Sequence, residues 1–287
     1  MGTTNINTNT KLHETRFPWK KLLIHLVLIA GIGITILPFF WMITTAFKTQ
    51  GESVQMPPIW FPSQWRLDSF FEIWGKPTFV QAYLNTIIST VVTVIGQVGI
   101  CALAAYSFAR IKFPGRDILF VTVLGVLMIP SQIFLMPQYL IIQKLGLLNS
   151  IPALFLPNLF SAFGTFLLRQ AFLTLPSELE EAAMLDGCNR FQTFYKIMLP
   201  LTKSSLVALS IMVMKFAWND LMWPLIVNTS AKKMTLAPTL SSMISEYGSN
   251  YPVQMAGAVL SILPLVILFV IFQKQFIEGV ASTGVKG

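Results

Sequence analysis

Apolar residues gather in six segments separated by polar stretches, and this alternation dominates the sequence. Each segment is close to the ~20 residues that a helix needs to cross ~30 Å of hydrocarbon. A backbone in lipid must satisfy its own hydrogen bonds, so the pattern predicts helices rather than strands. We therefore expect an all-α, polytopic membrane protein with six transmembrane helices. The segments are Leu22–Phe47, Leu84–Ala109, Ile118–Tyr139, Ile151–Leu173, Ser205–Val227 and Met255–Phe276.

Proline recurs inside these segments. A proline removes a backbone donor and bends a helix, so bends are predicted at each of them. One interpretation is a kinked bundle around a pathway that opens and closes. The other is the ordinary enrichment of proline in membrane helices. The residues are Pro38, Pro130, Pro157, Pro224 and Pro264.

The two long loops on the opposite side from the N-terminus differ in character. Residues 48–83 carry Trp60, Trp65 and Trp74 together with several prolines. They predict either a cap that contacts an external partner or aromatic side chains lying at the level of the lipid headgroups. Residues 228–252 are polar, and we expect a short amphipathic helix there.

Composition supports a membrane protein. Of 287 residues, 54% are apolar and 11% charged, and the mean hydropathy is +0.66. A soluble domain usually carries about 25% charged residues. The net charge of +8 does not indicate nucleic-acid binding, because lysine and arginine are scattered between the apolar segments. Cys101 and Cys188 have no metal-ligand spacing, so we expect free thiols and no metal site.

Charge also predicts the orientation. With the N-terminus inside, the inner segments hold more lysine and arginine than the outer ones by about two to one, as the positive-inside rule requires. Both termini are therefore expected in the cytoplasm. Residues 1–21 form a cytoplasmic segment and residues 22–287 one transmembrane domain. The first apolar run is too long for a signal peptide and lacks a small-residue cleavage site, so we expect an uncleaved span.

A polar stretch, residues 176–200, lies between the fourth and fifth apolar segments. Ser177 and Glu180 have the spacing of a capping box, which predicts a helix start. Gly187 suits the left-handed residue that ends a helix. A second helix is predicted from Arg190, with an apolar face at i, i+3, i+4 and i+7 spacing. That face consists of Phe191, Phe194, Tyr195 and Met198.

The predicted helix–turn–helix is polar overall but carries one apolar face. From periodicity alone, two interpretations remain equally open: an amphipathic helix lying flat on the membrane, or a surface that docks on a partner protein. The chain has no GxxxxGK[ST] phosphate-binding loop. If ATP drives the protein, another polypeptide hydrolyses it.

Within this stretch the residues follow the pattern EAA-x3-G-x9-I-x-L-P. The pattern resembles the EAA loop of the membrane subunits of ABC importers, which docks on the ATP-hydrolysing subunit. The resemblance implies a cytoplasmic coupling loop in a chain that is not an enzyme and has no catalytic residue. It also implies no cofactor in this chain, with ATP and Mg bound by partner subunits. The residues expected to couple to the ATPase are Glu181, Ala182, Ala183, Asp186, Gly187, Ile197, Leu199 and Pro200.

Two further stretches resemble the carbohydrate-uptake type of these importers. Trp218-Asn219-Asp220 with Trp223-Pro224-Leu225 resembles a motif in the fifth span. The tail, residues 277–287, resembles the ending of the smaller maltose-transporter-type permease subunit. It departs from that ending at Val280, Ser282 and Thr283. The tail residues that the resemblance places against the ATPase are Gly284, Val285, Lys286 and Gly287.

The resemblance implies an assembly. A second homologous permease subunit would complete the translocation path, two ATP-binding subunits would lie below, and a solute-binding protein would lie outside the membrane. The substrate would be a sugar or oligosaccharide, the surroundings membrane lipid, and the location the inner membrane of a bacterial or archaeal cell.

A sugar path requires hydrogen-bonding amides and stacking aromatic rings. The candidates are Asn85, Asn158, Trp218 and Asn219. Each of them also suits a role in helix packing. Lys215 and Asp220 are ionisable residues in or near the fifth span, where charge is costly and usually functional. Asp220 lies towards the outer end of its span, away from the mid-membrane position that an ion-coupled carrier needs.

Three other functions remain open: an ABC permease for an amino acid, peptide or polyol phosphate, an ion-coupled secondary transporter, and a non-transporting scaffold. A secondary transporter often has pseudo-symmetric halves, and the sequence contains no evident repeat. Mono-, di- and oligosaccharides all fit the sequence.

Overall fold

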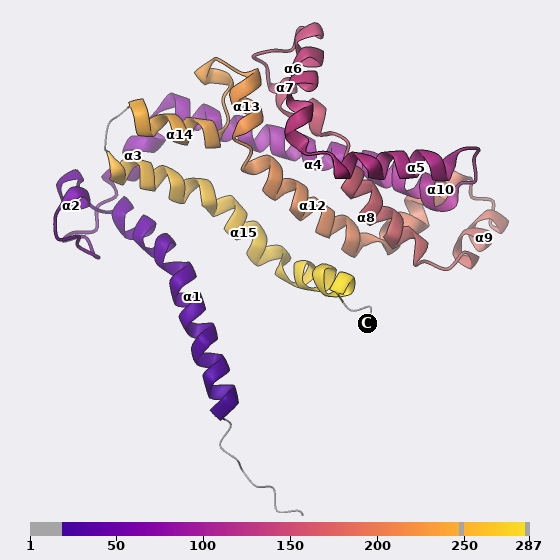
Figure 1. The fold of residues 1–287 in the computed structure, drawn as a ribbon, viewed down its shortest axis with the longest axis horizontal. Coiled ribbons are helices and arrows are strands. Elements are labelled where there is room, and N and C mark those ends of the chain that lie inside the picture. The colour runs from indigo at the N-terminus through magenta and orange to yellow at the C-terminus, as the bar shows by residue number, and fades with distance from the viewer. Residues whose placement is uncertain (1–18, 247–249, 285–287) are drawn as a thin grey trace, which may run out of the picture.

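The computed structural model describes residues 19–246 and 250–284, and every regular element within them is a helix (Figure 1). This confirms the predicted all-α class. The α-helices are α1 (Trp19–Ala46), α2 (Gln50–Val54), α3 (Asp68–Trp74), α4 (Pro77–Arg110), α5 (Arg116–Gly125), α6 (Leu135–Lys144), α7 (Ile151–Phe155), α8 (Ala162–Leu173), α9 (Glu178–Leu185), α10 (Arg190–Thr193), α11 (Leu199–Leu201), α12 (Lys203–Trp218), α13 (Met222–Val227), α14 (Leu236–Glu246) and α15 (Tyr251–Gly284). The other elements are the 3-10 helices η1 (Val126–Met128), η2 (Ser131–Phe134), η3 (Leu156–Asn158) and η5 (Ala231–Lys233), and the π-helix η4 (Phe194–Met198).

Three single helices within the described residues, α1, α4 and α15, are long and apolar enough to cross a membrane. Three further pairs of helical segments pass the same test together but are bent at a short break. Counting each pair as one span gives the six that the sequence predicts. The pairs are 116–128 with 131–144, bent by 102°, 151–158 with 162–173, bent by 48°, and 190–201 with 203–218, bent by 79°. The first half of the third pair lies in the polar stretch 176–200, and its second half overlaps the predicted fifth segment, Ser205–Val227.

The bends predicted at Pro130 and Pro157 are confirmed. Pro130 lies at the 102° break between η1 and η2, and Pro157 lies in η3, just before the 48° break. Each proline lacks the N–H that a regular helix would use, so the helix is interrupted there. Pro38 and Pro264, in contrast, lie inside the unbroken helices α1 and α15.

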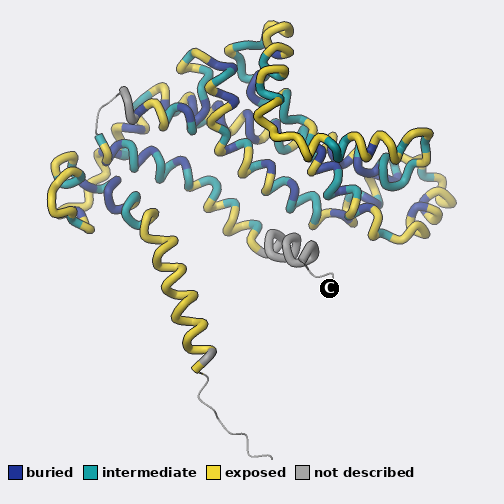
Figure 2. Tube along the Cα trace, viewed as in Figure 1, coloured by how far each residue is buried: buried dark blue, intermediate teal, exposed yellow. Residues whose placement is uncertain are grey.

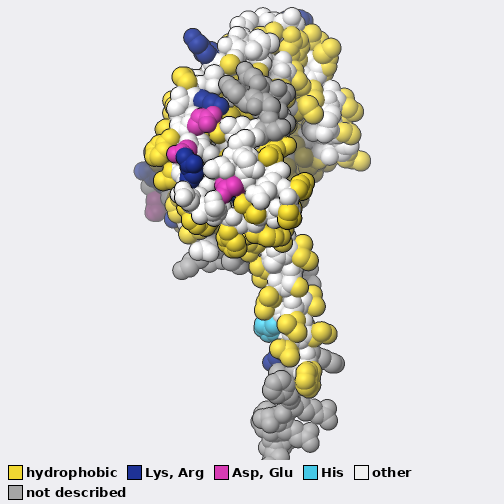
Figure 3. All heavy atoms as spheres, turned by 90° about the vertical axis from the view of Figure 1, so that its left-hand side faces the viewer, with side chains coloured by type: hydrophobic (Ala, Val, Ile, Leu, Met, Phe, Trp, Pro, Cys, Tyr) yellow, Lys and Arg dark blue, Asp and Glu magenta, His cyan; other side chains and the backbone are white. Residues whose placement is uncertain are grey.

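Helix α1 stands away from the bundle (Figures 1 and 2). Its side chains are exposed from Lys21 to Phe39, and Figure 3 shows hydrophobic atoms along the helix. Only the last turn, residues 44–46, is buried, near the end of α1 that packs against α15. An apolar helix exposed on all sides needs lipid or another polypeptide around it.

Helix α4 lies at the centre of the bundle and packs against α8 and α12. Small residues allow this close approach. A Cβ atom placed on Gly164 of α8 would lie 3.1 Å from Cys101 Sγ of α4 and 3.2 Å from the methyl carbons of Leu209 of α12. Three helices therefore meet at a point where only glycine fits without displacement of a neighbour.

The loop after α1 folds into a packed cap on that end of the bundle. Lys48 is buried there, where its ammonium donates a 2.7 Å hydrogen bond to the Ile59 carbonyl and lies 3.9 Å from the centre of the Trp41 ring. Trp41 packs edge-on against Trp60, and Phe47 packs against Trp65. The amphipathic helix expected in residues 228–252 is also present, as α14.

The carboxylate of Glu52 holds the two sides of this cap together. It accepts hydrogen bonds from the hydroxyl and the backbone N–H of Ser63 and from the backbone N–H of Thr49, which caps α2. Donation by Ser63, then by Thr49, lowers the pKa of Glu52 from 4.5 to about 2. These hydrogen bonds favour the ionised carboxylate.

We expect Gly164→Leu to destabilise the junction of α4, α8 and α12 by about 1–3 kcal/mol, because the new side chain would overlap two well-packed neighbours. The measurement is the thermal unfolding midpoint of the detergent-purified protein. Gly99→Leu is the matched control, since a Cβ at Gly99 of α4 meets no atom within 4 Å. Equal midpoints for the two variants would contradict the close packing at Gly164.

We expect the cap to weaken in acid. The pKa of Glu52 is lower in the folded cap than in the unfolded chain, so its stabilisation is complete above pH 4.5 and is lost as the pH falls to about 2. Hydrogen exchange of the Ser63 and Thr49 amides measures this. In Glu52→Gln the same amides should exchange faster at neutral pH. Unchanged protection in that variant would show that other contacts hold the cap.

Candidate functional site

The polar stretch between α8 and α12 forms the predicted helix–turn–helix, α9 and α10. Gly187 has a φ of +84°, in the left-handed region, as predicted. The Cys188 N–H donates to the Ala183 carbonyl over 2.9 Å, and the Gly187 N–H donates to the Met184 carbonyl over 3.0 Å. This pair of bonds is a Schellman motif, which satisfies the last carbonyls of α9 and reverses the chain.

The predicted capping box at Ser177 is wrong. Ser177 already has helical backbone angles, and its side chain caps nothing. Its intended partner, Glu180, is buried instead of reaching back to the helix start. The capping box of this stretch lies in the next helix, where Asn189 and Gln192 exchange two 2.8 Å hydrogen bonds. The N-x-x-Q spacing was readable in the sequence.

The predicted apolar face of the second helix divides in two. Phe194 and Met198 are buried, but Phe191 and Tyr195 are 66% and 63% exposed. One cause is that the helix continues from α10 into the π-helix η4, whose wider turn moves successive side chains off the regular α-helical face. Phe194 and Met198 therefore anchor the stretch in the bundle, and Phe191 and Tyr195 are available to contact another molecule.

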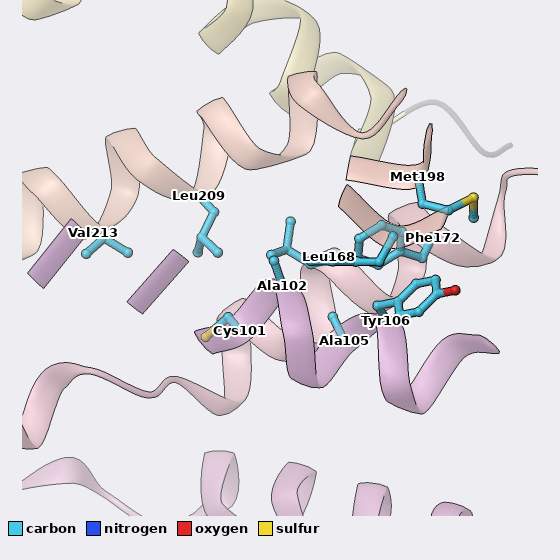
Figure 4. Close-up of a cluster of buried hydrophobic side chains, with 10 residues drawn as sticks. Cys101, Ala102, Ala105, Tyr106, Leu168, Phe172, Met198, Leu209 and Val213 are labelled. Carbon is cyan, nitrogen blue, oxygen red and sulfur yellow. The ribbon is translucent and has the colours of Figure 1, made fainter. Parts of the chain in front are cut away.

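The anchoring half inserts into an apolar cluster that joins four elements. Phe194 lies 5.1 Å from the ring of Tyr106 in α4 and 6.2 Å from Phe172 in α8. Figure 4 shows Tyr106, Phe172 and Met198 together at one end of this cluster, with Leu209 and Val213 of α12 further along it. The polar stretch is therefore fixed to the same side chains that pack three helices of the bundle together.

Apolar side chains are also exposed around the turn. Leu185, directly before it, is 89% exposed, and Met184 is 43% exposed. Together with Phe191 and Tyr195 they form what we call the apolar patch: Met184, Leu185, Phe191 and Tyr195. No periodic pattern in the sequence selects Met184 or Leu185. The only signal is their position, as two large apolar residues at the end of a mostly polar helix, just before Asp186 and Gly187.

The structure divides the residues predicted to couple to the ATPase into exposed and anchored sets. Ala183 is buried, and Ile197 and Leu199 pack against the apolar cluster. The others lie at the surface of the loop, and their coupling role stays a prediction. These exposed residues are Glu181, Ala182, Asp186, Gly187 and Pro200.

Arg110, the last residue of α4, reaches across to α8 and α9. Its guanidinium donates a 2.6 Å hydrogen bond to the Phe172 carbonyl and a second, shorter one to the Leu175 carbonyl. Its Nε lies 4.0 Å from the carboxylate of Glu180 in α9. The Tyr106 hydroxyl lies beside the same carboxylate. The sequence suggests a capping box for Glu180, and no local pattern connects this residue with Arg110 or Tyr106.

Two candidates for the transport path serve helix packing. Asn85 is buried, and its amide donates to the carbonyls of Lys232 and Met234, at 3.0 and 2.8 Å, while Gln81 donates to its oxygen. Trp218 is also buried and donates to the Ser261 carbonyl over 3.0 Å. The hydrogen-bonding groups of both residues are already used inside the chain.

The other two candidates are more accessible. Asn158, in η3, is partly buried and makes a 3.5 Å contact with the Leu154 carbonyl. Asn219 is exposed and lines a groove of about 560 Å³ between α12 and α15. Lys215 lines the same groove, whose other walls are almost entirely apolar. The four candidates therefore do not converge on one site within this chain.

Two other predictions receive no test from the geometry. Val285, Lys286 and Gly287 of the tail lie outside the described residues, and Gly284 is the last residue of α15. Within residues 19–246 and 250–284, no three histidine, cysteine, aspartate or glutamate side chains converge in a way that could hold a metal ion.

Residues 97–281 match the family described as binding-protein-dependent transport system inner membrane component. The chain is 36% identical over 257 residues to an arabinooligosaccharides transport system permease protein of Halalkalibacterium halodurans, a match that covers 88% of this chain and 92% of the relative. It is 30% identical over 269 residues to an sn-glycerol-3-phosphate transport system permease protein of Yersinia pestis bv. Antiqua, covering 90% and 95%.

A solved structure has the same fold. It comes from a bacterial ABC transporter involved in the import of the acidic polysaccharide alginate, and it matches with a TM-score of 0.83 at 21% identity. The match covers 90% of this chain and 96% of that one. The matched family region includes the whole of the α9–α10 stretch and the apolar cluster beneath it.

We expect Phe194→Ala to lower the thermal unfolding midpoint of the purified chain, because loss of a buried phenylalanine costs about 3–5 kcal/mol. Phe191→Ala is the control on the same helix. Its ring is mostly exposed, so the midpoint should stay close to that of the unaltered chain. If Phe191→Ala were the more harmful change, the division of this face into anchored and exposed halves would be incorrect.

Proposed function

This chain belongs to the family of binding-protein-dependent transport system inner membrane components, and on that premise we propose that it is one of two permease subunits of an ATP-driven sugar importer. Its family places it in the inner membrane, as a transport component rather than an enzyme. In this proposal ATP and Mg bind to two partner subunits in the cytoplasm. A solute-binding protein delivers the sugar or oligosaccharide from the other side of the membrane.

The observation that carries the proposal is the apolar patch on an otherwise polar loop. Leu185 is almost completely exposed at the end of α9, and the rings of Phe191 and Tyr195 are mostly exposed on the helix that follows the turn. Glu178, Glu181 and Asp186 are exposed on the same helix and turn, so the segment is too charged to sink into lipid. A knob of this kind suits a cleft in a protein, where apolar anchors provide most of the binding energy and charged residues form the rim.

The same geometry supports a transmission role. The patch lies at the end of a segment whose opposite face, Phe194 and Met198, is fixed in the apolar cluster with α4, α8 and α12. Protein interiors are close-packed, so a displacement at the patch is passed to the helices behind it. When an ATPase subunit moves the knob, these three helices move with it.

Two surfaces suit the second permease subunit. The exposed apolar length of α1 needs a cover, and the groove between α12 and α15 is open on one side. In this arrangement each subunit supplies part of the path, and Asn158 and Asn219 remain candidates for it. Both termini lie in the cytoplasm, where the tail, including Gly284–Gly287, reaches the ATPase subunits.

A polyol phosphate is the second candidate substrate. The motivation is Lys215, which lines the α12–α15 groove and makes no ion pair within the described part of the chain. An ammonium at the depth of a membrane span is costly unless an anion accompanies it. Thermal-shift screening of the solute-binding protein against neutral oligosaccharides and sn-glycerol-3-phosphate separates the two candidates.

We expect Gly187→Asp and Glu181→Lys each to lower uptake by at least about tenfold while the protein still inserts in the membrane. Aspartate at Gly187 strains the left-handed turn by ~1–2 kcal/mol, and lysine at Glu181 reverses a charge at the edge of the apolar patch. Uptake is measured in cells, and insertion by the amount of protein in the membrane fraction.

Gly115→Asp is the matched control for the first variant. Gly115 also has a left-handed backbone, with a φ of +78°, and a Cβ there meets no atom within 4 Å, as at Gly187. It lies outside the α9–α10 stretch, so uptake should persist. Normal uptake in both coupling-loop variants would refute the proposal. So would a homomer of this chain that transports in liposomes without ATP.

A further inference from the structure

Helix α9 carries the EAA motif but has few attachments to the bundle. Among its eight residues, only Glu180 and Ala183 are buried. Ala183 carries only a methyl group, and α9 packs against α10 and η4 of its own stretch. Glu180 adds a direct link to the spanning helices, because its carboxylate meets Arg110 at the end of α4. In contrast, η4 is fixed by the rings and sulfur of Phe194 and Met198.

Glu180 enters a small polar cluster under the loop. Its carboxylate faces Arg110 Nε at 4.0 Å, and the Tyr106 hydroxyl lies next to it. Arg110 in turn holds the carbonyls of Phe172 and Leu175, at the end of α8 and just after it. One guanidinium thus connects the end of α4, the end of α8 and the start of α9.

The central polar atoms of this cluster are shielded from water, so water cannot satisfy them. Glu180 Oε1, Arg110 Nε and the Tyr106 hydroxyl are buried, and none of these three atoms has a hydrogen bond. A buried ion pair adds little to stability on average, whereas removal of one charge leaves the other unpaired at a considerable cost, so the pair favours the arrangement in which both charges are matched. Glu181, the next residue, is exposed and free for a partner.

We propose that Arg110 and Glu180 are positioning residues for energy coupling: they hold α9 at a fixed angle to α4 and α8, so that a displacement of α9 by the ATPase reaches both spans. The inference rests on the proposed function. It assigns the two consecutive glutamates different tasks. Glu181 belongs to the surface that contacts the partner, and Glu180 transfers the motion inward.

If Glu180 and Arg110 only added to overall stability, their removal would give a different pattern of hydrogen exchange. A change that unfolds the whole stretch would loosen α9, α10 and η4 together. Loss of the Glu180–Arg110 contact should free α9 alone, since Phe194 and Met198 still hold η4 in the apolar cluster. The Gly187 turn would then act as a hinge between a loose helix and a fixed one.

The test uses the complex of this chain with its co-purified subunits in proteoliposomes, with hydrogen exchange as the readout. In Glu180→Gln, amides of residues 179–186 should exchange about tenfold faster, while those of residues 190–198 keep their protection. Trapping with MgATP and vanadate should alter exchange in residues 101–110 of α4 in the unaltered complex, and this response should be lost in Glu180→Gln. ATP hydrolysis without vanadate should continue in that variant.

Asp117→Asn is the matched control, because Asp117 is exposed in α5, outside the α9–α10 stretch, and the change also removes one negative charge. It should behave as the unaltered complex does. Arg110→Gln gives a second, independent variant. If the two residues act as one unit, the double variant Arg110→Gln/Glu180→Gln should speed α9 exchange no more than either single change.

Three outcomes separate the possibilities. If the unaltered complex neither contains an ATPase nor responds to MgATP and vanadate, the proposed function itself fails. If it responds and Glu180→Gln responds equally, the positioning role is overturned. If Glu180→Gln accelerates exchange equally in residues 179–186 and 190–198, the contact is merely structural and the inference is also overturned.

Discussion

The packing of Phe194 and Met198 against Tyr106, Phe172 and their neighbours is the contact on which the rest of the structure depends. It fixes a polar, exposed segment to a bundle whose other surfaces are apolar. Without it, α9 and α10 would be a tethered loop on the membrane surface. With it, the exposed apolar patch is packed onto α4, α8 and α12, as the proposed transmission of a displacement requires.

Polar and apolar contacts have separate tasks in this connection. The apolar cluster gives η4 a fixed place, and the non-directional hydrophobic effect is well suited to that. The guanidinium of Arg110 fixes relative orientation, because its planar N–H donors fit only certain arrangements of the carbonyls and carboxylate around it. The aromatic rings thus hold η4 firmly to the bundle, and the charged groups set the angle of α9 to α4 and α8.

Much of this architecture was readable from the sequence. Length and apolarity identified the six segments, and Gly187 was correctly predicted as a left-handed helix end, because few residues other than glycine adopt that conformation. What could not be read was the pairing across elements. Ser177 and Glu180 have capping-box spacing, but Arg110, far away in sequence, attracts the glutamate inward.

Helix breaks and the residues of the site also depend on contacts between elements, which the sequence alone does not reveal. Proline in a span can break a helix, as at Pro130, or lie within an unbroken one, as at Pro264, and the neighbouring helices decide between these outcomes. The π-helical turn of η4 moved half of an expected apolar face out of the core, and no local pattern announces such a turn. Buried amides such as Asn85 looked like ligand contacts until their carbonyl partners were known.

The isolation of α1 has a consequence for the life of the protein before it works. Only the last turn of this helix is buried, so a newly made, unassembled copy presents a long unshielded hydrophobic rod within the bilayer. Until another apolar surface covers it, this rod is surrounded by lipid alone, and two such copies can associate through it.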